Sequence, residues 1–263
     1  MSDTDAGRSD RSGHVLHLLG TGGWMPSGQR ETSCFMIRRG TRVLILDAGT
    51  GIRRLATQPS LLEGVERIDI ALSHFHLDHL VGLSYLDAIG TGIEKVVWGP
   101  GRAAYGVSTI DILNRILAPP FSSAARQELF TAVKDIDMAG EQIGPHPVTV
   151  RVQDRHTHPS VSFRYADLVA YCTDTAFDAD NGGLARGVRL LLHEAWLTGP
   201  TGSASHSTAS EAARVALMAE AQALILVHLD PRAEHDLLLA ESRSLFTATD
   251  LGRDGLAIPL GAS

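Results

Sequence analysis

The feature of this sequence that most constrains its fold is segment 74–79, His-Phe-His-Leu-Asp-His, which holds four potential metal ligands within six residues. The segment follows an apolar run at 67–72 that predicts a buried strand, and it leads into a helical pattern. Two histidines spaced His-x-His lie on the same side of an extended chain, because side chains alternate there. The Asp-His pair at the following turn can face a second ion. The cluster therefore indicates a site for zinc, manganese or iron.

The composition is that of a globular protein, with 44% hydrophobic and 20% charged residues in a chain of 263. Residues 1–13 contain almost nothing apolar and predict a disordered tail, whereas 14–263 predict a single domain, since no linker-like stretch divides them. Neither a secretory signal nor an apolar run of about 20 residues is present. We therefore expect a soluble cytoplasmic protein with no membrane partner. Cys34 and Cys172 lie in apolar runs and predict buried free thiols.

The order of the predicted elements indicates the fold class. Apolar runs predict strands at 14–19, 34–39, 42–46, 67–72, 95–98, 148–153, 161–165, 168–172, 189–193, 224–228 and 256–258. Helices are predicted at 78–89, 108–117, 123–133, 207–219 and 234–246, with Ser207 as an N-cap and Glu211 in the following turn. Each half passes through hairpin strands and then alternates strand with helix. This order predicts an α/β (α+β layered) fold, an αββα sandwich of two mixed sheets with helices on the outer faces.

Further potential ligands lie where later strands end. Asp174 follows the run at 168–172, and His228 ends the run at 224–228. Side chains at such positions converge on one edge of a sheet. A histidine after the run at 148–153 completes the set, and both His156 and His158 qualify, because they lie on the same side of an extended stretch.

This pattern of His-x-His-x-Asp-His, then a His, an Asp and a last His at strand ends, resembles the metallo-β-lactamase superfamily. The resemblance runs from Val15 onward and includes the turns at 19–23 and 47–51. Within the superfamily the sequence is most similar to tRNase Z-like phosphodiesterases. That likeness rests on the entry motif at 19–34, on His193-Glu194-Ala195 followed by His206-Ser207, and on Val227-His228-Leu229 with Pro231-Arg232. Trp196 stands where that branch usually has Thr.

The resemblance implies two divalent metal ions, zinc above all. It assigns His74, His76 and His158 to one ion, Asp78, His79 and His228 to the other, and Asp174 to a bridging position. It favours His158 over His156, because the Pro-Ser pair and strand that follow match the family pattern. Asp78, His206 and Glu194 are the expected catalytic residues, with His206 at the scissile phosphate or the leaving group and oriented by Glu194. Asp47 is expected to support the ligand loop.

The resemblance, together with His206 and Glu194, implies hydrolysis of a phosphodiester, with two nearby cations that would lower the pKa of a shared water. The chain has no insertion for the substrate-gripping arm of tRNase Z, and His158 and Asp174 are only 16 residues apart. The net charge of −7 also disfavours a large RNA. A small anionic substrate is expected, such as a cyclic nucleotide or a cyclic sugar phosphate. The alternatives are a lactonase or thioesterase on the same centre, or a non-hydrolytic biosynthetic accessory protein. The resemblance also implies a possible homodimer.

Other residues near these motifs fit simpler roles. The glycines of segment 20–23 predict a tight turn beneath the metal site, since their spacing does not match a dinucleotide fingerprint. Trp24, Met25 and Tyr85 fit either a substrate pocket or the core. The remaining histidines are expected to be ordinary structural residues, and they are His14, His17, His146 and His235.

Overall fold

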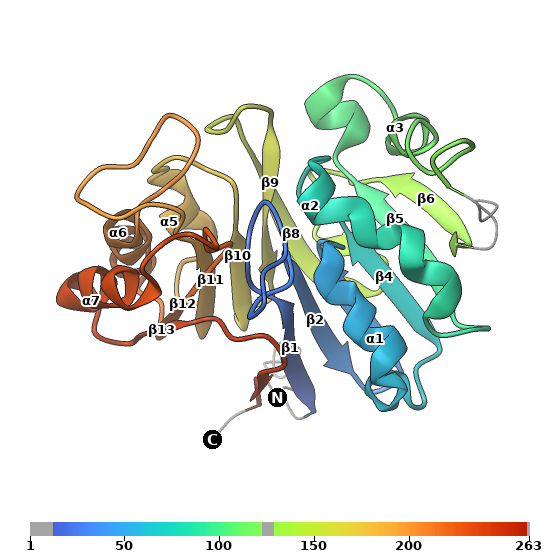
Figure 1. The fold of residues 1–263 in the computed structure, drawn as a ribbon, viewed down its shortest axis with the longest axis horizontal. Helices are drawn as coiled ribbons and strands as arrows, with labels where there is room; N and C mark the ends of the chain where they lie inside the picture. The colour runs from blue at the N-terminus through green and yellow to red at the C-terminus, as the bar shows by residue number, and fades with distance from the viewer. Residues whose placement is uncertain (1–12, 123–128, 262–263) are drawn as a thin grey trace, which may run out of the picture.

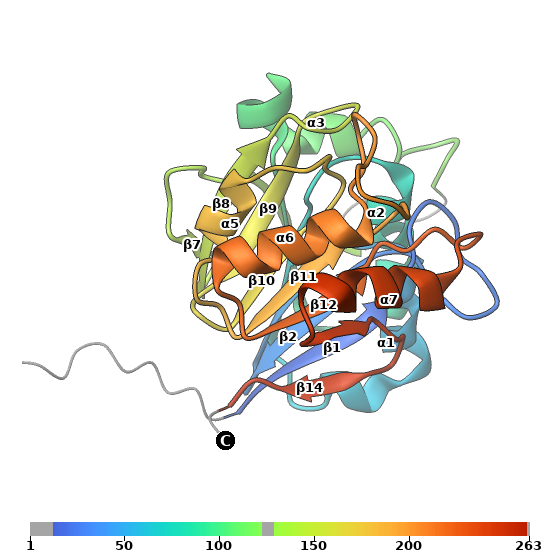
Figure 2. The ribbon, with the colours of Figure 1, turned by 90° about the vertical axis from the view of Figure 1, so that its left-hand side faces the viewer.

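Two sheets pack face to face with helices on their outer faces (Figures 1 and 2). The computed structural model describes residues 13–122 and 129–261 of the chain. Within these residues each sheet has seven strands. The predicted αββα arrangement is confirmed. The N-terminal segment that the sequence predicts to be a tail lies outside the described residues, except for Gly13.

The first sheet has the order β14-β1-β2-β3-β4-β5-β6. Its strands are β1 (His14–Gly20), β2 (Cys34–Arg39), β3 (Arg42–Leu46), β4 (Arg67–Ala71), β5 (Glu94–Gly99), β6 (Ala132–Asp135) and β14 (Ala257–Pro259). β1, β2 and β3 are antiparallel neighbours, whereas β3 to β6 are parallel. The outer face is covered by η1 (Thr50–Arg53), α1 (Arg54–Thr57), η2 (Pro59–Leu62), α2 (Leu77–Leu80), η3 (Val81–Ala88), η4 (Gly101–Tyr105) and α3 (Thr109–Leu113).

The second sheet has the order β13-β12-β11-β10-β9-β8-β7. Its strands are β7 (Gln142–Ile143), β8 (His146–Gln153), β9 (Ser160–Tyr165), β10 (Val169–Cys172), β11 (Leu190–Glu194), β12 (Ala223–Val227) and β13 (Thr249–Leu251). β10, β11, β12 and β13 run parallel, so their carboxyl ends meet at one edge. The helices α5 (Asp180–Leu184), α6 (Ala209–Ala219) and α7 (His235–Leu245) lie on the outer face (Figure 2).

The layer between the sheets is an apolar core of side chains from both inner faces. Phe35 of the first sheet packs on Tyr171 of the second, with ring centroids 4.9 Å apart. Phe163 lies beside Tyr171 in the same layer. Cys34 and Cys172 are buried and free, as predicted, and burial raises the pKa of Cys172 to about 12. This packing fixes the two sheets relative to each other at the edge where the parallel strands end.

Several predicted elements differ from those observed. The pattern at 78–89 forms a single α-helical turn, α2, followed by the 3₁₀ helix η3. The buried residues Leu80, Leu83, Leu86 and Ile89 recur every three positions, and a 3₁₀ helix places such residues on one face. The strands β6, β7 and β13, each of two to four residues, were not predicted. In the predicted helix at 123–133, residues 123–128 lie outside the described part, and the segment from Ala132 onward is strand β6.

None of the helices in the described residues is long and apolar enough to cross a membrane.

Helix α6 begins at Ala209, and its N-cap is Thr208, one residue after the predicted cap. The Thr208 side chain accepts a hydrogen bond from the Glu211 backbone N–H at 3.1 Å, and Glu211 accepts one from the Thr208 N–H at 3.0 Å. Ser207, the predicted cap, instead donates to the carbonyl of Thr175 at 2.7 Å. The reciprocal pair satisfies two backbone donors at the start of the helix.

We expect Thr208→Ala to lower the free energy of unfolding by about 1 kcal/mol, because it leaves a buried helix donor without its acceptor. Ser210→Ala is the matched control, since Ser210 lies in the same helical turn and does not cap it. Chemical denaturation of both variants measures the difference. Equal losses of stability would contradict a capping role.

Candidate metal centre

The segment that follows β4 brings its histidines next to Asp174 and His228, which follow β10 and β12 of the second sheet. The structure gathers six of the seven predicted ligands there, together with His156. They are His74, His76, Asp78, His79, Asp174 and His228. His74 and His79 are fully buried, and Asp174 and His228 are almost so.

One group of possible ligands consists of His74, His76, His156 and Asp174. Each offers one ligand atom, and these atoms all lie within 4.8 Å of one another. The Oδ2 atom of Asp174 lies 3.6 Å from His74 Nε2 and 3.5 Å from His156 Nε2. Three imidazoles and one carboxylate at this spacing can hold a divalent transition metal.

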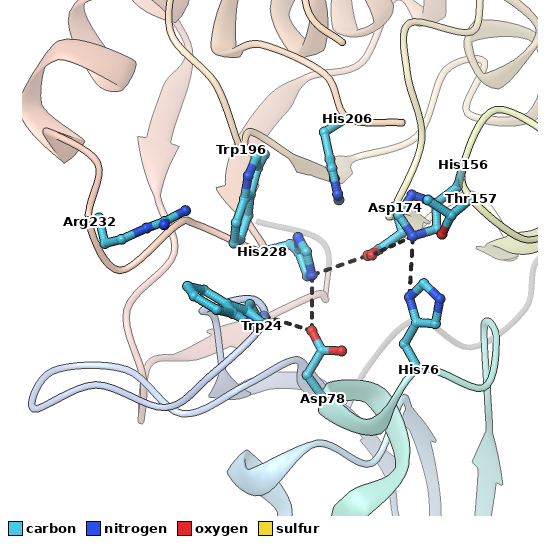
Figure 3. A pocket seen from close by; sticks show the side chains of 10 residues that line it. All are labelled: Trp24, His76, Asp78, His156, Thr157, Asp174, Trp196, His206, His228 and Arg232. Carbon is cyan, nitrogen blue, oxygen red and sulfur yellow. Dashed lines mark hydrogen bonds and ion pairs between the residues drawn. The ribbon is translucent and has the colours of Figure 1, made fainter. Parts of the chain in front are cut away.

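A second group consists of Asp78, His79 and His228. The Oδ1 atom of Asp174 lies 3.2 Å from the Nε2 atoms of both His79 and His228. The two oxygens of Asp174 therefore face different groups, which is the arrangement that a bridging carboxylate requires. Asp78 Oδ2 closes the second group at 3.3 Å from His228 Nε2 (Figure 3).

The structure places His156, and not the preferred His158, in the first group of possible ligands. His158 is exposed and contributes to neither group, and its Nδ1 lies 3.4 Å from His76 Nε2. Residues 154–159 bend instead of continuing as a strand, so the side chains of His156 and His158 do not lie on the same side of the chain as they would in a strand. His156 Nδ1 donates to the Ser205 carbonyl at 2.8 Å, which leaves Nε2 as the acceptor facing Asp174.

Neighbouring groups also fix the tautomers of the buried histidines. His79 Nδ1 donates to Asp47 Oδ2 at 2.8 Å, and His74 Nδ1 lies 2.9 Å from Ser73 Oγ. The Nε2 atoms of both rings are buried and have no hydrogen-bond partner among the described residues. An unpaired buried nitrogen is costly unless a cation binds it. The donor set therefore fits metal ions. Asp47 occupies the supporting position that the resemblance implies.

The electrostatics of the cluster favour a cation as well. Burial and the charge of His79 hold the pKa of His74 well below its usual range, so His74 keeps a lone pair. Burial alone would raise the pKa of Asp174, but the charges of His228 and His79 outweigh it and hold that pKa far below normal. Burial likewise opposes protonation of His79, yet the carboxylates of Asp174 and Asp78 raise its pKa. The cluster thus concentrates negative potential on its centre.

The backbone at the site is unusual. Trp24, Asp47, Asp174 and His228 all have a φ between 47° and 62°, in the left-handed region that non-glycine residues seldom adopt. Such residues cost of order 1–3 kcal/mol each and cluster at functional sites. Gly23 is required by close approach, since a Cβ there would lie 2.5 Å from the ring of His228. The predicted glycine turn therefore packs directly against the cluster.

A pocket of about 440 Å³ opens over the cluster (Figure 3). His206 lines it and bonds to the buried Glu194, as the sequence predicts for that pair. Trp24 also lines the pocket, Met25 is exposed, and Tyr85 packs against the core of the first sheet. The pocket residues that sequence reasoning did not assign to the site are Thr157, Trp196 and Arg232.

We expect His156→Ala to lower metal affinity by roughly 10- to 100-fold or more. Loss of a residue that only supports a ligand costs that much, and His156 is proposed as a ligand itself. His158→Ala, two residues away, is the matched control and should keep its metal. Metal content after dialysis, measured by elemental analysis, distinguishes the two variants. Loss of metal from His158→Ala alone would restore the original assignment.

The comparisons with known proteins agree with this geometry. The chain is 28% identical to the ribonuclease Z of Prochlorococcus marinus (strain NATL1A), over 94% of this chain and 99% of that protein. Among solved structures it resembles the metallo-β-lactamase fold protein YhfI from Bacillus subtilis, with a TM-score of 0.77, 21% identity and coverage of 93% and 98%. It also resembles a diphosphatase from the PhnP family, with a TM-score of 0.69, 20% identity and coverage of 93% and 97%. These likenesses confirm the predicted resemblance. Residues 41–229 match the family described as the beta-lactamase superfamily domain, and the chain belongs to that family.

Proposed function

We propose that this protein is a two-metal hydrolase that cleaves a small, anionic phosphodiester. The observation that carries the proposal is the pair formed by His206 and Glu194 beside the metal cluster. His206 lies next to the cluster, since one of its ring nitrogens is within 4.8 Å of a carboxylate oxygen of Asp174 and a ring nitrogen of His228. A histidine held there can donate to an oxygen of a substrate bound at the cluster.

The pair is arranged for proton donation. His206 Nδ1 donates to Glu194 Oε2 at 3.0 Å, and its ring points into the pocket (Figure 3). Glu194 is fully buried and also accepts the backbone N–H of Thr175, so it cannot swing away. Burial lowers the pKa of His206, but the hydrogen bond and charge of Glu194 outweigh burial and raise it. The protonated ring is therefore favoured, and it can stabilise charge or give a proton at a leaving oxygen.

The metal cluster supplies the rest of the chemistry. Two bound divalent ions, zinc in this proposal and manganese or iron with the same ligands, would activate water and stabilise charge on the phosphate. His74, His76 and His156 would hold one ion, and Asp78, His79 and His228 the other, with Asp174 between them. Asp47 keeps the His79 ring in the orientation that ligation needs.

Three observations support a small substrate instead of a large RNA. The pocket of about 440 Å³ is of the size that holds small molecules. The alignment with the ribonuclease Z spans 317 positions, more than the 263 residues of this chain, so that relative carries residues that this chain lacks. The net charge of −7 is unfavourable for a long polyanion. The homodimer stays a prediction.

We expect the metal-loaded protein to hydrolyse bis(p-nitrophenyl) phosphate faster than a simple lactone, since in this proposal His206, bonded to Glu194, acts on a phosphate ester. His206→Ala should lower kcat by about 10²- to 10⁴-fold for a phosphodiester with an alkoxide leaving group, which needs a proton, lower it far less for bis(p-nitrophenyl) phosphate, and leave metal content unchanged. His17→Ala, which removes a histidine of β1 outside the pocket, is the control.

Two outcomes would contradict this proposal. Turnover of the lactone alone would move the chemistry to carbon, as in a lactonase. Loss of metal from His206→Ala would make His206 a ligand instead of a proton donor. Glu194→Gln separates these roles further, because it removes the charge that favours the protonated ring and keeps a side chain of the same shape.

A further inference from the structure

Three side chains form the side of the pocket that lies away from His156 (Figure 3). We call Trp24, Trp196 and Arg232 the tryptophan wall. Trp24 is 54% exposed, although most of an indole is apolar and its exposure to water is unfavourable. An exposed tryptophan beside a catalytic pocket indicates a surface that becomes covered when a ligand binds.

The Trp24 ring is held in place before any ligand arrives. Its backbone N–H donates to Asp78 Oδ2 at 2.7 Å, and its φ of 62° is left-handed. The guanidinium of Arg232 lies over the indole, 4.8 Å from the ring centroid. Arg232 is itself clamped to Asp230 by two hydrogen bonds of 2.9 and 2.8 Å. A side chain fixed in this way loses little conformational entropy on binding.

Trp196 connects this wall to the residues proposed to act on the substrate. Its ring is stacked on His206, with centroids 5.3 Å apart and an interplanar angle of 29°. It also lies 5.3 Å from the ring of His228. A phosphate at the metal cluster and a planar group on the wall are therefore within the span of one small molecule.

We propose that the tryptophan wall binds a nucleobase, so that the substrates are nucleotide phosphodiesters and not cyclic sugar phosphates. This inference rests on the proposed phosphodiesterase function. Every nucleobase has a flat π-face that can stack on an indole, so the stacking stabilises binding of any of the bases. A saturated sugar ring contacts an indole only through its C–H groups and has no π-face to stack on the exposed Trp24 ring. A nucleotide carries both groups that this pocket would bind: a phosphate for the metal cluster and a flat base for the tryptophan wall.

The test compares two esters with the same leaving group, thymidine 5′-(p-nitrophenyl phosphate) and methyl p-nitrophenyl phosphate. The wild-type protein should prefer the thymidine ester in kcat/KM. Trp24→Ala should lower the ratio of the two kcat/KM values about tenfold or more, the effect that stacking of one base on one aromatic side chain produces. Trp24→Phe should restore most of the ratio. Phe121→Ala removes another exposed aromatic ring, outside the pocket, and should leave the ratio unchanged.

The outcomes separate this inference from the proposed function. If the wild-type protein hydrolyses both esters and Trp24→Ala keeps the same ratio, the wall does not bind a base. If the wild-type protein hydrolyses neither ester, the proposed function fails. Titration with thymidine 5′-monophosphate then still tests the wall, because a stacked base quenches tryptophan fluorescence. Quenching that is lost in Trp24→Ala and kept in Phe121→Ala supports the inference, and its absence in the wild-type protein overturns it.

Discussion

The carboxylate of Asp47 is the contact on which both the sheet sandwich and the metal cluster depend. It is fully buried, and a buried charge is stable only if hydrogen bonds surround it. Asp47 Oδ1 accepts the backbone N–H of Ser73 at 2.7 Å, and Oδ2 accepts Ser73 Oγ, His79 Nδ1 and Tyr171 Oη at 2.8 Å each. Ser73 follows β4 of the first sheet, whereas Tyr171 lies on β10 of the second. One carboxylate therefore joins the two sheets directly beneath a predicted metal ligand.

This position explains why the turn that starts at Asp47 has so little freedom. Asp47 adopts a φ of 58°, and a Cβ at Gly49 would lie 2.3 Å from the carbonyl oxygen of Asp78. The turn therefore packs against the segment that carries the predicted ligands, and the Asp47 side chain sets the tautomer of His79. The Asp47 carboxylate thus both stabilises the fold and orients the His79 ring for a metal ion. A relaxed turn at Asp47 would misplace that ring, so the strained backbone is tolerated.

The parts of this arrangement that follow from local patterns could be predicted, and the parts that follow from tertiary contacts could not. Apolar runs bounded by turn residues predicted eleven strands correctly, because a buried strand needs a run of apolar residues in the sequence. The histidine pattern of 74–79 indicated the metal cluster in the same way. The choice between His156 and His158 depends on a bend and on the Ser205 carbonyl, 49 residues away, and no local pattern records that contact. The contact between Tyr171 and Asp47 joins residues 124 apart, so it too was invisible in the sequence.

The metal cluster and the tryptophan wall are not independent parts of the pocket, because they share one oxygen atom. Asp78 Oδ2 accepts the backbone N–H of Trp24 at 2.7 Å and lies 3.3 Å from His228 Nε2. A change in how Asp78 meets a metal ion must therefore alter the hydrogen bond that positions the Trp24 backbone, and the reverse also holds. The candidate metal centre and the Trp24 backbone are thus both set by the Asp78 carboxylate. The net charge of −7 over the whole chain does not prevent this centre from attracting an anion, since distant surface charges are screened by salt over about 10 Å.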